Sequence, residues 1–357
     1  MAKVRNGSAA ARSVVVSFAA MFGIGSPFAM GQTVIEWAKP LSGSWHDPID
    51  WVGGVVPNSP TVIARLAQQG AYQVNYSSWS GTAISVVGLE IVNPDAMLRL
   101  EGLSLHMGDA QPVSIVNEGT ILSVGCCNAP PGGMKFFSDA EFVGQGTFFA
   151  GGKGGTAISI DAGKQLVNSA SHTLSGGKFL VLFKEGSELV NHGTMDFPWS
   201  ASGMFMSGPA GLRLETESRL VVSLLYKSQP ATIVGDDAGF VRLDGLLELV
   251  QATGVHFIVG DVFVLIKGPP IEGEFAAVKY PAAPAGTAWR LDYQTNQVRL
   301  VLVCAADCDG DASLTIDDFV CFQTLFVLGE PQADCDGDGM LAIDDFVCFQ
   351  SAFALGC

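Results

Sequence analysis

The chain of 357 residues carries 19 basic and 35 acidic residues, which gives a formal net charge of −16 at pH 7. This balance, with no basic stripe in the sequence, argues against nucleic acid as a partner. Beyond the N-terminal region no segment holds 18 uninterrupted apolar residues, so we expect no membrane span.

The N-terminus begins with basic residues and continues into a short apolar run, Val14–Gly25. This run is too short to span a bilayer as a helix. Small residues stand at Ala29 and Gly31, three and one positions before Gln32. The pattern indicates a signal peptide over residues 1–31 with cleavage near Gly31–Gln32. We therefore expect a secreted protein, extracellular or held at the cell surface.

Residues 32–303 are rich in glycine and β-branched residues, and one short phrase recurs in them. Its second residue advances by steps of 24, 27, 24 and 23. A period of this size indicates stacked rungs, and we predict a right-handed parallel β-helix, a solenoid. Asparagine recurring at one turn can form a ladder of side-chain amides along the stack, which is a structural role. The copies are Val92–Asn93, Val116–Asn117, Val143–Gly144, Val167–Asn168 and Val190–Asn191, with a weaker copy at Val234–Gly235.

Both ends of this region resemble secreted, autotransporter-like (pectin-lyase-like) β-helical proteins. Residues 44–58 follow the opening W-x-x-x-x-N-W-x-G-G-x-x-P-N of that group, except that Asp50 stands where the group has Asn. The resemblance implies that residues 245–303 close and cap the solenoid. We interpret Trp45 and Trp51 as an apolar cap over the first rung, and a sugar-binding platform is the alternative.

Catalytic motifs are missing from the sequence of the repeat region. There is no H-E-x-x-H, G-x-S-x-G or P-loop pattern, and the five histidines are scattered. His192 lies in a repeat turn, and Asp236–Asp237 is the one acidic pair of this region, although acids can also converge from different rungs. Cys126 and Cys127 adjoin in a loop, where we expect a vicinal disulfide; a ligand-gripping loop is the alternative.

The C-terminus contains two near-identical blocks, 306–329 and 333–356, which match at 18 of 24 positions. Each begins a 12-residue loop, 307–318 or 334–345, with acids at alternating positions and ends it with an acid. This spacing suits calcium, which takes 6–8 oxygen ligands from positions 1, 3, 5, 7 and 12 of an EF-hand-type loop. An apolar pattern typical of a helix follows each loop, over 319–328 and 346–355. The expected ligands of two Ca²⁺ sites are Asp307, Asp309, Asp311, Ser313, Asp318, Asp334, Asp336, Asp338, Met340 and Asp345.

These repeats resemble a dockerin, the module that plugs secreted proteins into a cohesin-bearing partner. The Cys-rich form ending in Gly356–Cys357 is similar to a type found on secreted planctomycete-type proteins. The resemblance implies a domain over 304–357 and a cohesin-like partner. Loop position 6 is Ala312 in the first copy but Gly339 in the second, so the first site is expected to be weaker. The residues implied in partner choice, Ile316, Asp317, Ile343 and Asp344, differ from the usual small hydroxyl residues, which points away from a standard cellulosomal cohesin.

Six of the eight cysteines lie in the last 54 residues, which hold 11 acids and no Lys or Arg. A domain this small needs metal or disulfides for stability. Following the repeat, we predict the pairs Cys308–Cys321, Cys335–Cys348 and Cys304–Cys357, each contributing on the order of 3 kcal/mol. Zinc is the alternative, but a spacing of 13 is unlike a C-x-x-C knuckle.

The sequence favours a secreted, non-catalytic solenoid for adhesion or carbohydrate binding, anchored to a partner through the calcium-dependent dockerin. The competing hypothesis is a polysaccharide-degrading hydrolase or lyase, because dockerins often carry such enzymes. Neither the glycan nor the catalytic residues can be read from the residues themselves.

Overall fold

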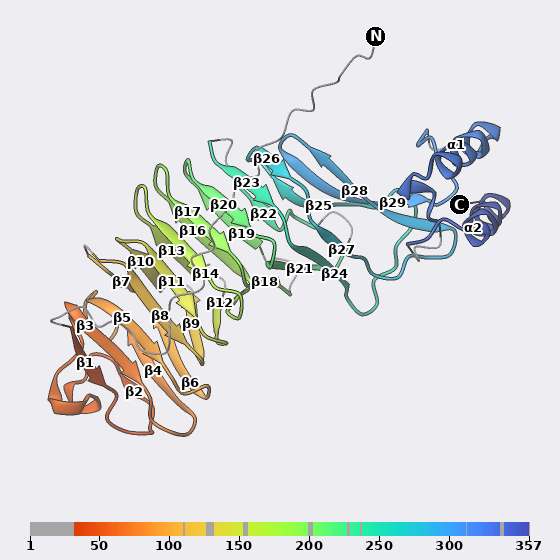
Figure 1. Ribbon diagram of the computed structural model, residues 1–357. Coiled ribbons are helices and arrows are strands. Elements are labelled where there is room, and N and C mark those ends of the chain that lie inside the picture. Colours follow the sequence, from red (N-terminus) through yellow and green to blue (C-terminus); the bar gives the residue numbers. More distant parts are fainter. Residues whose placement is uncertain are drawn as a thin grey trace, which may run out of the picture. The chain divides into compact units, whose positions relative to one another are not determined.

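The computed structural model describes residues 32–109, 111–125, 132–152, 156–198, 203–226, 229–235, 238–311, 313–335 and 339–356. It is mainly β, a parallel solenoid of about 8 turns followed by a small region of two helices (Figure 1). The predicted fold class is confirmed. The predicted signal peptide, Cys126, Cys127, Asp236, Asp237, Ala312, Asp336, Asp338 and Cys357 lie outside the described residues.

Three ladders of parallel strands run along the solenoid. From β7 onward one strand of each ladder makes a rung, whereas the strands before β7 belong to the first two ladders. The first ladder is β1 (Thr33–Glu36), β3 (Ser59–Leu66), β5 (Ser85–Ile91), β8 (Val113–Asn117), β11 (Ala140–Val143), β14 (Gln165–Asn168), β17 (Glu188–Asn191), β20 (Gly211–Leu214), β23 (Phe240–Leu243) and β26 (Ile271–Gly273). The second is β2 (Gly43–Ser44), β4 (Tyr72–Ser77), β6 (Ala96–Glu101), β9 (Thr120–Gly125), β12 (Thr147–Gly152), β15 (Thr173–Gly176), β18 (Thr194–Phe197), β21 (Arg219–Leu224), β24 (Leu246–Gln251) and β27 (Ala277–Lys279). The third is β7 (Ser104–Met107), β10 (Gly133–Phe136), β13 (Thr156–Ile160), β16 (Lys178–Phe183), β19 (Gly203–Ser207), β22 (Ile233–Val234) and β25 (Val262–Lys267).

The core is built from columns of apolar side chains that stack in register from rung to rung. Because side chains alternate across a strand, every second residue of each ladder points inward. In the second ladder one such column is at most 1% exposed from β6 to β24. Its members are Leu98, Ile121, Phe148, Leu174, Met195, Leu220 and Leu247.

The predicted asparagine ladder is present, and a histidine completes it. Asn117, Asn168 and Asn191 are fully buried at the ends of first-ladder strands, and Asn168 Nδ2 donates to Asn191 Oδ1 at 2.7 Å. On the intermediate strand β11 Phe142 is in register with Asn168, and His172 bridges the interval between Asn117 and Asn168. The His172 ring lies 3.0 Å from the Asn117 amide and 2.6 Å from Asn168 Oδ1.

The prediction that Val234–Gly235 is a further copy of the repeat turn was wrong. Val234 belongs to β22 of the third ladder, whereas the other copies end strands of the first. The residue that follows Asn191 in the stack is Leu214 of β20. Leu214 is 1% exposed, so at this rung the column passes from amides to an ordinary apolar residue.

The first rung is closed by tryptophan, as the cap interpretation expected. Trp37, Trp45 and Trp51 are at most 2% exposed and pack edge to face at 5.0 Å. Two short 3₁₀ turns, Pro48–Asp50 and Val52–Gly54, shape this cap. Buried Asp50 accepts from Ser44 N–H at 2.9 Å and pairs with Lys39 at 2.5 Å, which compensates for a carboxylate at an Asn position.

The other end of the solenoid is closed by an antiparallel hairpin. Its strands are β28 (Thr287–Gln294) and β29 (Gln297–Cys304), and β29 also pairs antiparallel with β25. Antiparallel pairing ends the parallel stacking at this edge. The expected cap over 245–303 therefore consists of this hairpin together with the last short strands.

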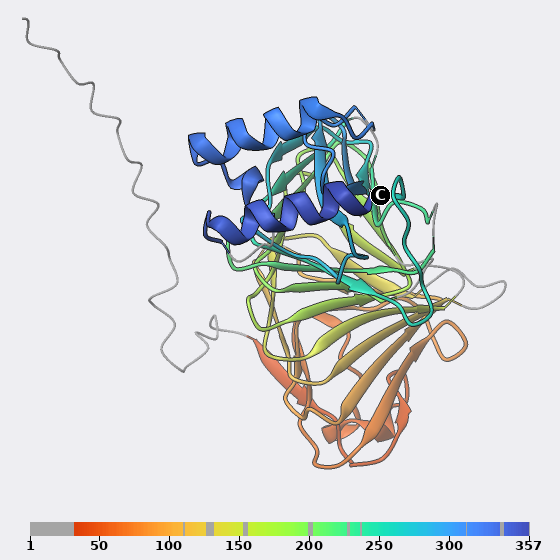
Figure 2. The same cartoon turned by 90° about the vertical axis from the view of Figure 1, so that its right-hand side faces the viewer.

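Two helices follow the hairpin, α1 (Ile316–Leu328) and α2 (Ile343–Leu355), with a 3₁₀ turn at Pro331–Ala333 between them. Each begins three residues before the segment predicted from the apolar pattern. Figure 2 shows the two helices side by side. Phe322 of α1 stacks on Phe349 of α2 with ring centres 4.2 Å apart, and four further phenylalanines surround this pair. They are Phe319, Phe326, Phe346 and Phe353.

Candidate calcium centre and solenoid faces

The first acidic loop gathers three carboxylates ahead of α1. Asp307, Asp309 and Asp311 each place an oxygen within 4.8 Å of the others. Turn hydrogen bonds hold them there: Gly310 N–H donates to Asp307, Asp311 N–H to Asp309, and Ser313 N–H to Asp311. Gly310 takes a positive φ of 77°, which permits the sharp turn. Like charges this close repel one another, so the donor set fits a hard cation with oxygen ligands.

The acid that closes the loop, Asp318, is placed differently from the other three. It is fully buried, and its Oδ1 accepts from Cys308 N–H while its Oδ2 accepts from Thr315 N–H, both at 2.8 Å. Asp318 thus ties the start of the loop to the start of α1. It is not part of the three-carboxylate group; its Oδ1 also accepts from Asp309 N–H at 3.3 Å, whereas its Oδ2 keeps a second lone pair for a cation.

The second loop repeats this frame in its described residues. Buried Asp345 accepts from Cys335 N–H and Ala342 N–H, both at 2.8 Å, as Asp318 does in the first loop. Gly339 N–H donates to Asp334 at 2.9 Å, and Gly339 has a φ of 84°. Ser313 and Met340, the expected carbonyl ligands, are both exposed at loop position 7.

Disulfides fasten each loop to its helix. Cys308 is bonded to Cys321 and Cys335 to Cys348, with Cα atoms 5.8 and 5.9 Å apart. Both predicted pairs are confirmed, so these four cysteines have no thiolate to offer zinc. Cys304 is also disulfide-bonded; its pairing with Cys357 stays a prediction. Each bond joins loop position 2 to the second turn of the helix, and so stiffens a loop that no entering helix supports.

Both helices expose apolar residues beside the acidic loops. Ile316 and Val320 on α1 are 70% and 55% exposed, and their counterparts Ile343 and Val347 on α2 are 71% and 55% exposed. Residues four apart lie on one face of a helix, so each pair forms a short apolar stripe. Asp317 and Asp344 are exposed next to these stripes. The structure therefore presents two equivalent stripes, one per repeat.

Two carboxylates come together on the outer face of the second ladder. Asp196, Val221 and Glu248 occupy one outward column in register. Two strand spacings of about 4.8 Å separate Asp196 from Glu248. Burial raises the pKa of Asp196, whereas hydrogen bonds from Lys279 and Arg219 lower the pKa of Glu248. The motif search missed this pair because it looked for acids adjacent in sequence. Asp196 lies 25 residues before Val221, and Val221 lies 27 residues before Glu248. Each spacing is close to the repeat period, and this signal in the sequence could have indicated that the two acids share a face.

Other sequence candidates lie apart from one another. His192 is half-buried in its turn, 3.3 Å from Glu217, and forms no cluster with other histidines among the described residues. Trp45 and Trp51 are buried in the cap, which leaves no ring face for a sugar. No described helix is long and apolar enough to cross a membrane.

Comparisons of this chain with family models, with curated proteins and with solved structures find no match. The arrangement of residues described above therefore has to support any function on its own.

Proposed function

We propose that the chain is a secreted, non-catalytic β-solenoid that displays a binding surface, for adhesion or carbohydrate, and is anchored by a calcium-dependent dockerin. The observation that carries the proposal is the repeated loop, in which Asp307, Asp309 and Asp311 converge in a frame fixed by a disulfide and a buried carboxylate. An EF-hand-type loop offers calcium this donor set.

The two apolar stripes support the docking part of the proposal. Exposed isoleucine and valine on an otherwise acidic module provide the apolar contact that a protein interface requires at its centre. A cohesin-like partner would bury one stripe at a time. Because the stripes are equivalent, we expect docking in either of two orientations related by the repeat.

This proposal is tested with the mature chain, a panel of purified cohesin modules and three variants, with calcium present. Ile316→Asp/Val320→Asp alters the first stripe, Ile343→Asp/Val347→Asp alters the second, and a fourfold variant alters both. Each double variant is expected to bind with an affinity within about twofold of the unsubstituted chain. It loses one of two equivalent docking orientations, and this loss halves the affinity. The fourfold variant should bind at least 100-fold more weakly, about 2.7 kcal/mol.

Calcium removal supplies the matching control. A chelator should raise amide hydrogen exchange in α1 and α2 and leave strands such as β18 and β21 protected. Unchanged exchange in both helices would contradict the calcium role, whether or not a cohesin binds. Docking that survives in the fourfold variant would contradict the role of the stripes alone.

A second candidate function, polysaccharide hydrolysis, is favoured by one observation, the Asp196–Glu248 pair. An inverting glycosidase uses an acid and a base whose carboxyl groups are about 6.5–9.5 Å apart. Two strand spacings of about 4.8 Å place Asp196 and Glu248 near the upper end of this range, and their pKa values are shifted in opposite directions. The ion pairs from Arg219 and Lys279 occupy both oxygens of Glu248, which favours a structural role instead.

The hydrolysis candidate predicts sugar release that one substitution removes. Incubation with plant, algal and bacterial polysaccharides is expected to give retained protein without released sugars. If sugars are released, Asp196→Asn should lower the rate at least 100-fold and Asp244→Asn, at a half-buried aspartate of the β23–β24 turn, should not. Release that Asp196→Asn abolishes would replace the non-catalytic proposal by the hydrolase.

A further inference from the structure

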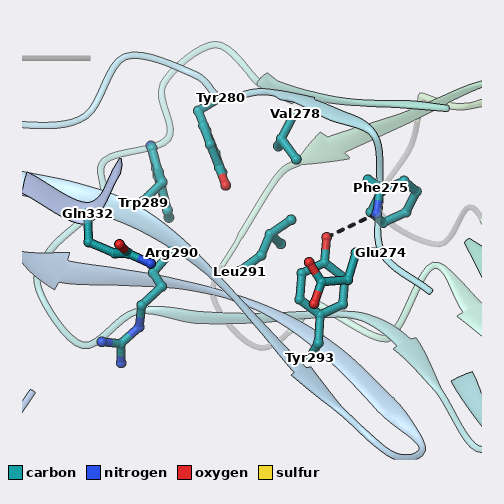
Figure 3. Close-up of a pocket in the computed structure, with 9 residues that line it drawn as sticks. All are labelled: Glu274, Phe275, Val278, Tyr280, Trp289, Arg290, Leu291, Tyr293 and Gln332. Atoms are coloured by element: carbon teal, nitrogen blue, oxygen red, sulfur yellow. Dashed lines mark hydrogen bonds between the residues drawn. The ribbon is translucent and has the colours of Figure 1, made fainter. Parts of the chain in front are cut away.

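An open groove lies against the hairpin that closes the solenoid. It has a volume of about 470 Å³, within the range of small-molecule sites (Figure 3). Its floor and walls come from the segment between β26 and β27, from β27 and the loop after it, from β28, and from the 3₁₀ turn between the two helices. The residues used below are Glu274, Val278, Tyr280, Trp289, Leu291 and Tyr293.

Strand alternation brings an apolar row to the floor of this groove. Trp289, Leu291 and Tyr293 are two residues apart on β28 and therefore share one face. These three and Val278 pack against the solenoid core. Trp289 is braced edge-on by Phe257 at 4.9 Å, and its Nε1–H donates to Pro281 O at 3.1 Å. The floor is thus preformed and rigid.

Polar atoms at the rim have capacity left for a ligand. The Tyr293 hydroxyl accepts from Phe275 N–H at 3.3 Å, so its own proton remains to be donated. Tyr280 is 40% exposed, and its hydroxyl is directed into the groove in Figure 3. Exposed Glu274 stands next to Tyr293 and offers carboxylate oxygens as acceptors. Arg290 also lines the groove, but it alternates with the apolar row on β28, and in Figure 3 its guanidinium is directed away from Leu291 and Tyr293.

We propose that this groove binds a neutral saccharide, with a pyranose ring seated against Tyr280 and Trp289 and its hydroxyls bonded by Glu274 and Tyr293. A pyranose has a face of C–H groups and a rim of hydroxyls. Aromatic rings with polar tips match both at once. The carboxylate accepts from sugar hydroxyls, whereas a uronic acid would meet it as a like charge. This inference rests on the proposed function: it locates the carbohydrate-binding surface of the solenoid in this groove and names neutral saccharides as its ligands.

The test titrates the mature chain with neutral hexasaccharides of glucose, mannose and xylose and with hexagalacturonate, by calorimetry in saturating calcium. At least one neutral hexasaccharide should bind with a Kd on the order of 0.1–1 mM, and hexagalacturonate should bind at least tenfold more weakly. Tyr280→Ala should weaken neutral binding about tenfold or more. Tyr226→Ala, which removes another tyrosine that is 46% exposed but lies outside the groove, should leave it unchanged.

Two results would overturn the proposal: no neutral hexasaccharide binds, or Tyr280→Ala and Tyr226→Ala behave alike. Glu274→Gln gives a second check that does not disturb the apolar floor. This substitution should lower the affinity for the neutral hexasaccharide and reduce the ratio of that affinity to the affinity for hexagalacturonate. Calcium uptake measured on the same samples distinguishes saccharide binding in the groove from calcium-dependent docking. A chain that binds calcium but no saccharide would contradict the first proposal and leave the second standing.

Discussion

Asp318→Ala is expected to remove one calcium site and to loosen the first loop and α1, and Asp345→Ala is expected to do the same in the second repeat. Each carboxylate is buried and accepts from backbone N–H groups at both ends of its loop. A hydrogen bond to a charged group contributes about 1.5–3 kcal/mol. Loss of two such bonds should therefore destabilise the helical module by about 3–6 kcal/mol, before any loss of metal.

The chain provides a control one residue away. Asp317→Ala and Asp344→Ala remove the same charge from exposed positions. They should keep two calcium ions per chain in calorimetric titration, whereas Asp318→Ala and Asp345→Ala should each keep one. Two ions retained in both buried-site variants would refute the assignment of position 12 as a ligand. A fall in both exposed-site variants would show that net charge, and not the loop frame, determines the stoichiometry.

The repeats made much of the architecture predictable. The Val-Asn phrase advances by one rung because Asn117, Asn168 and Asn191 all end strands of the first ladder. The duplicated loops likewise gave the two disulfides that are seen, since each pair recurs at the same spacing. In both cases a period in the sequence corresponds directly to a period in space.

Contacts between non-equivalent positions were not predictable in this way. His172 joins the asparagine ladder at the rung where Phe142, and not an asparagine, is in register with Asn168. Nothing at residue 172 itself marks this role. Asp196 and Glu248 share a face only through the exact rung lengths between them. The groove over β28 depends on how the closing hairpin folds back, which a repeat pattern does not encode.

His172 should make the solenoid less stable as the pH falls from about 6.5 to about 4. Its Nδ1–H donates to Asn168 Oδ1, its Nε2 accepts from the Asn117 amide, and its ring stacks on Phe142 at 4.8 Å. Burial lowers the pKa of His172 to about 4 from 6.5. Between pH 6.5 and pH 4 the histidine is protonated in the unfolded chain but neutral in the folded chain. The free energy of unfolding that this group contributes is therefore fully present above pH 6.5 and is lost as the pH falls to about 4. A shift of this size corresponds to about 3 kcal/mol.

The measurement is urea unfolding of residues 32–357 between pH 7.5 and pH 4, compared with the same protein carrying His172→Gln. Carboxylates with lowered pKa values, such as Asp161 and Asp292, also lose stabilising interactions as the pH falls, and they do so equally in both proteins. The difference between the two curves therefore isolates the histidine. His172→Gln should be less stable at pH 7.5, because the ladder is disturbed, and should lose about 3 kcal/mol less on acidification. His256→Gln, at an exposed position, should follow the unsubstituted chain. Parallel curves for all three proteins would contradict the prediction, because they would mean that the folded chain protonates His172 as readily as the unfolded chain does.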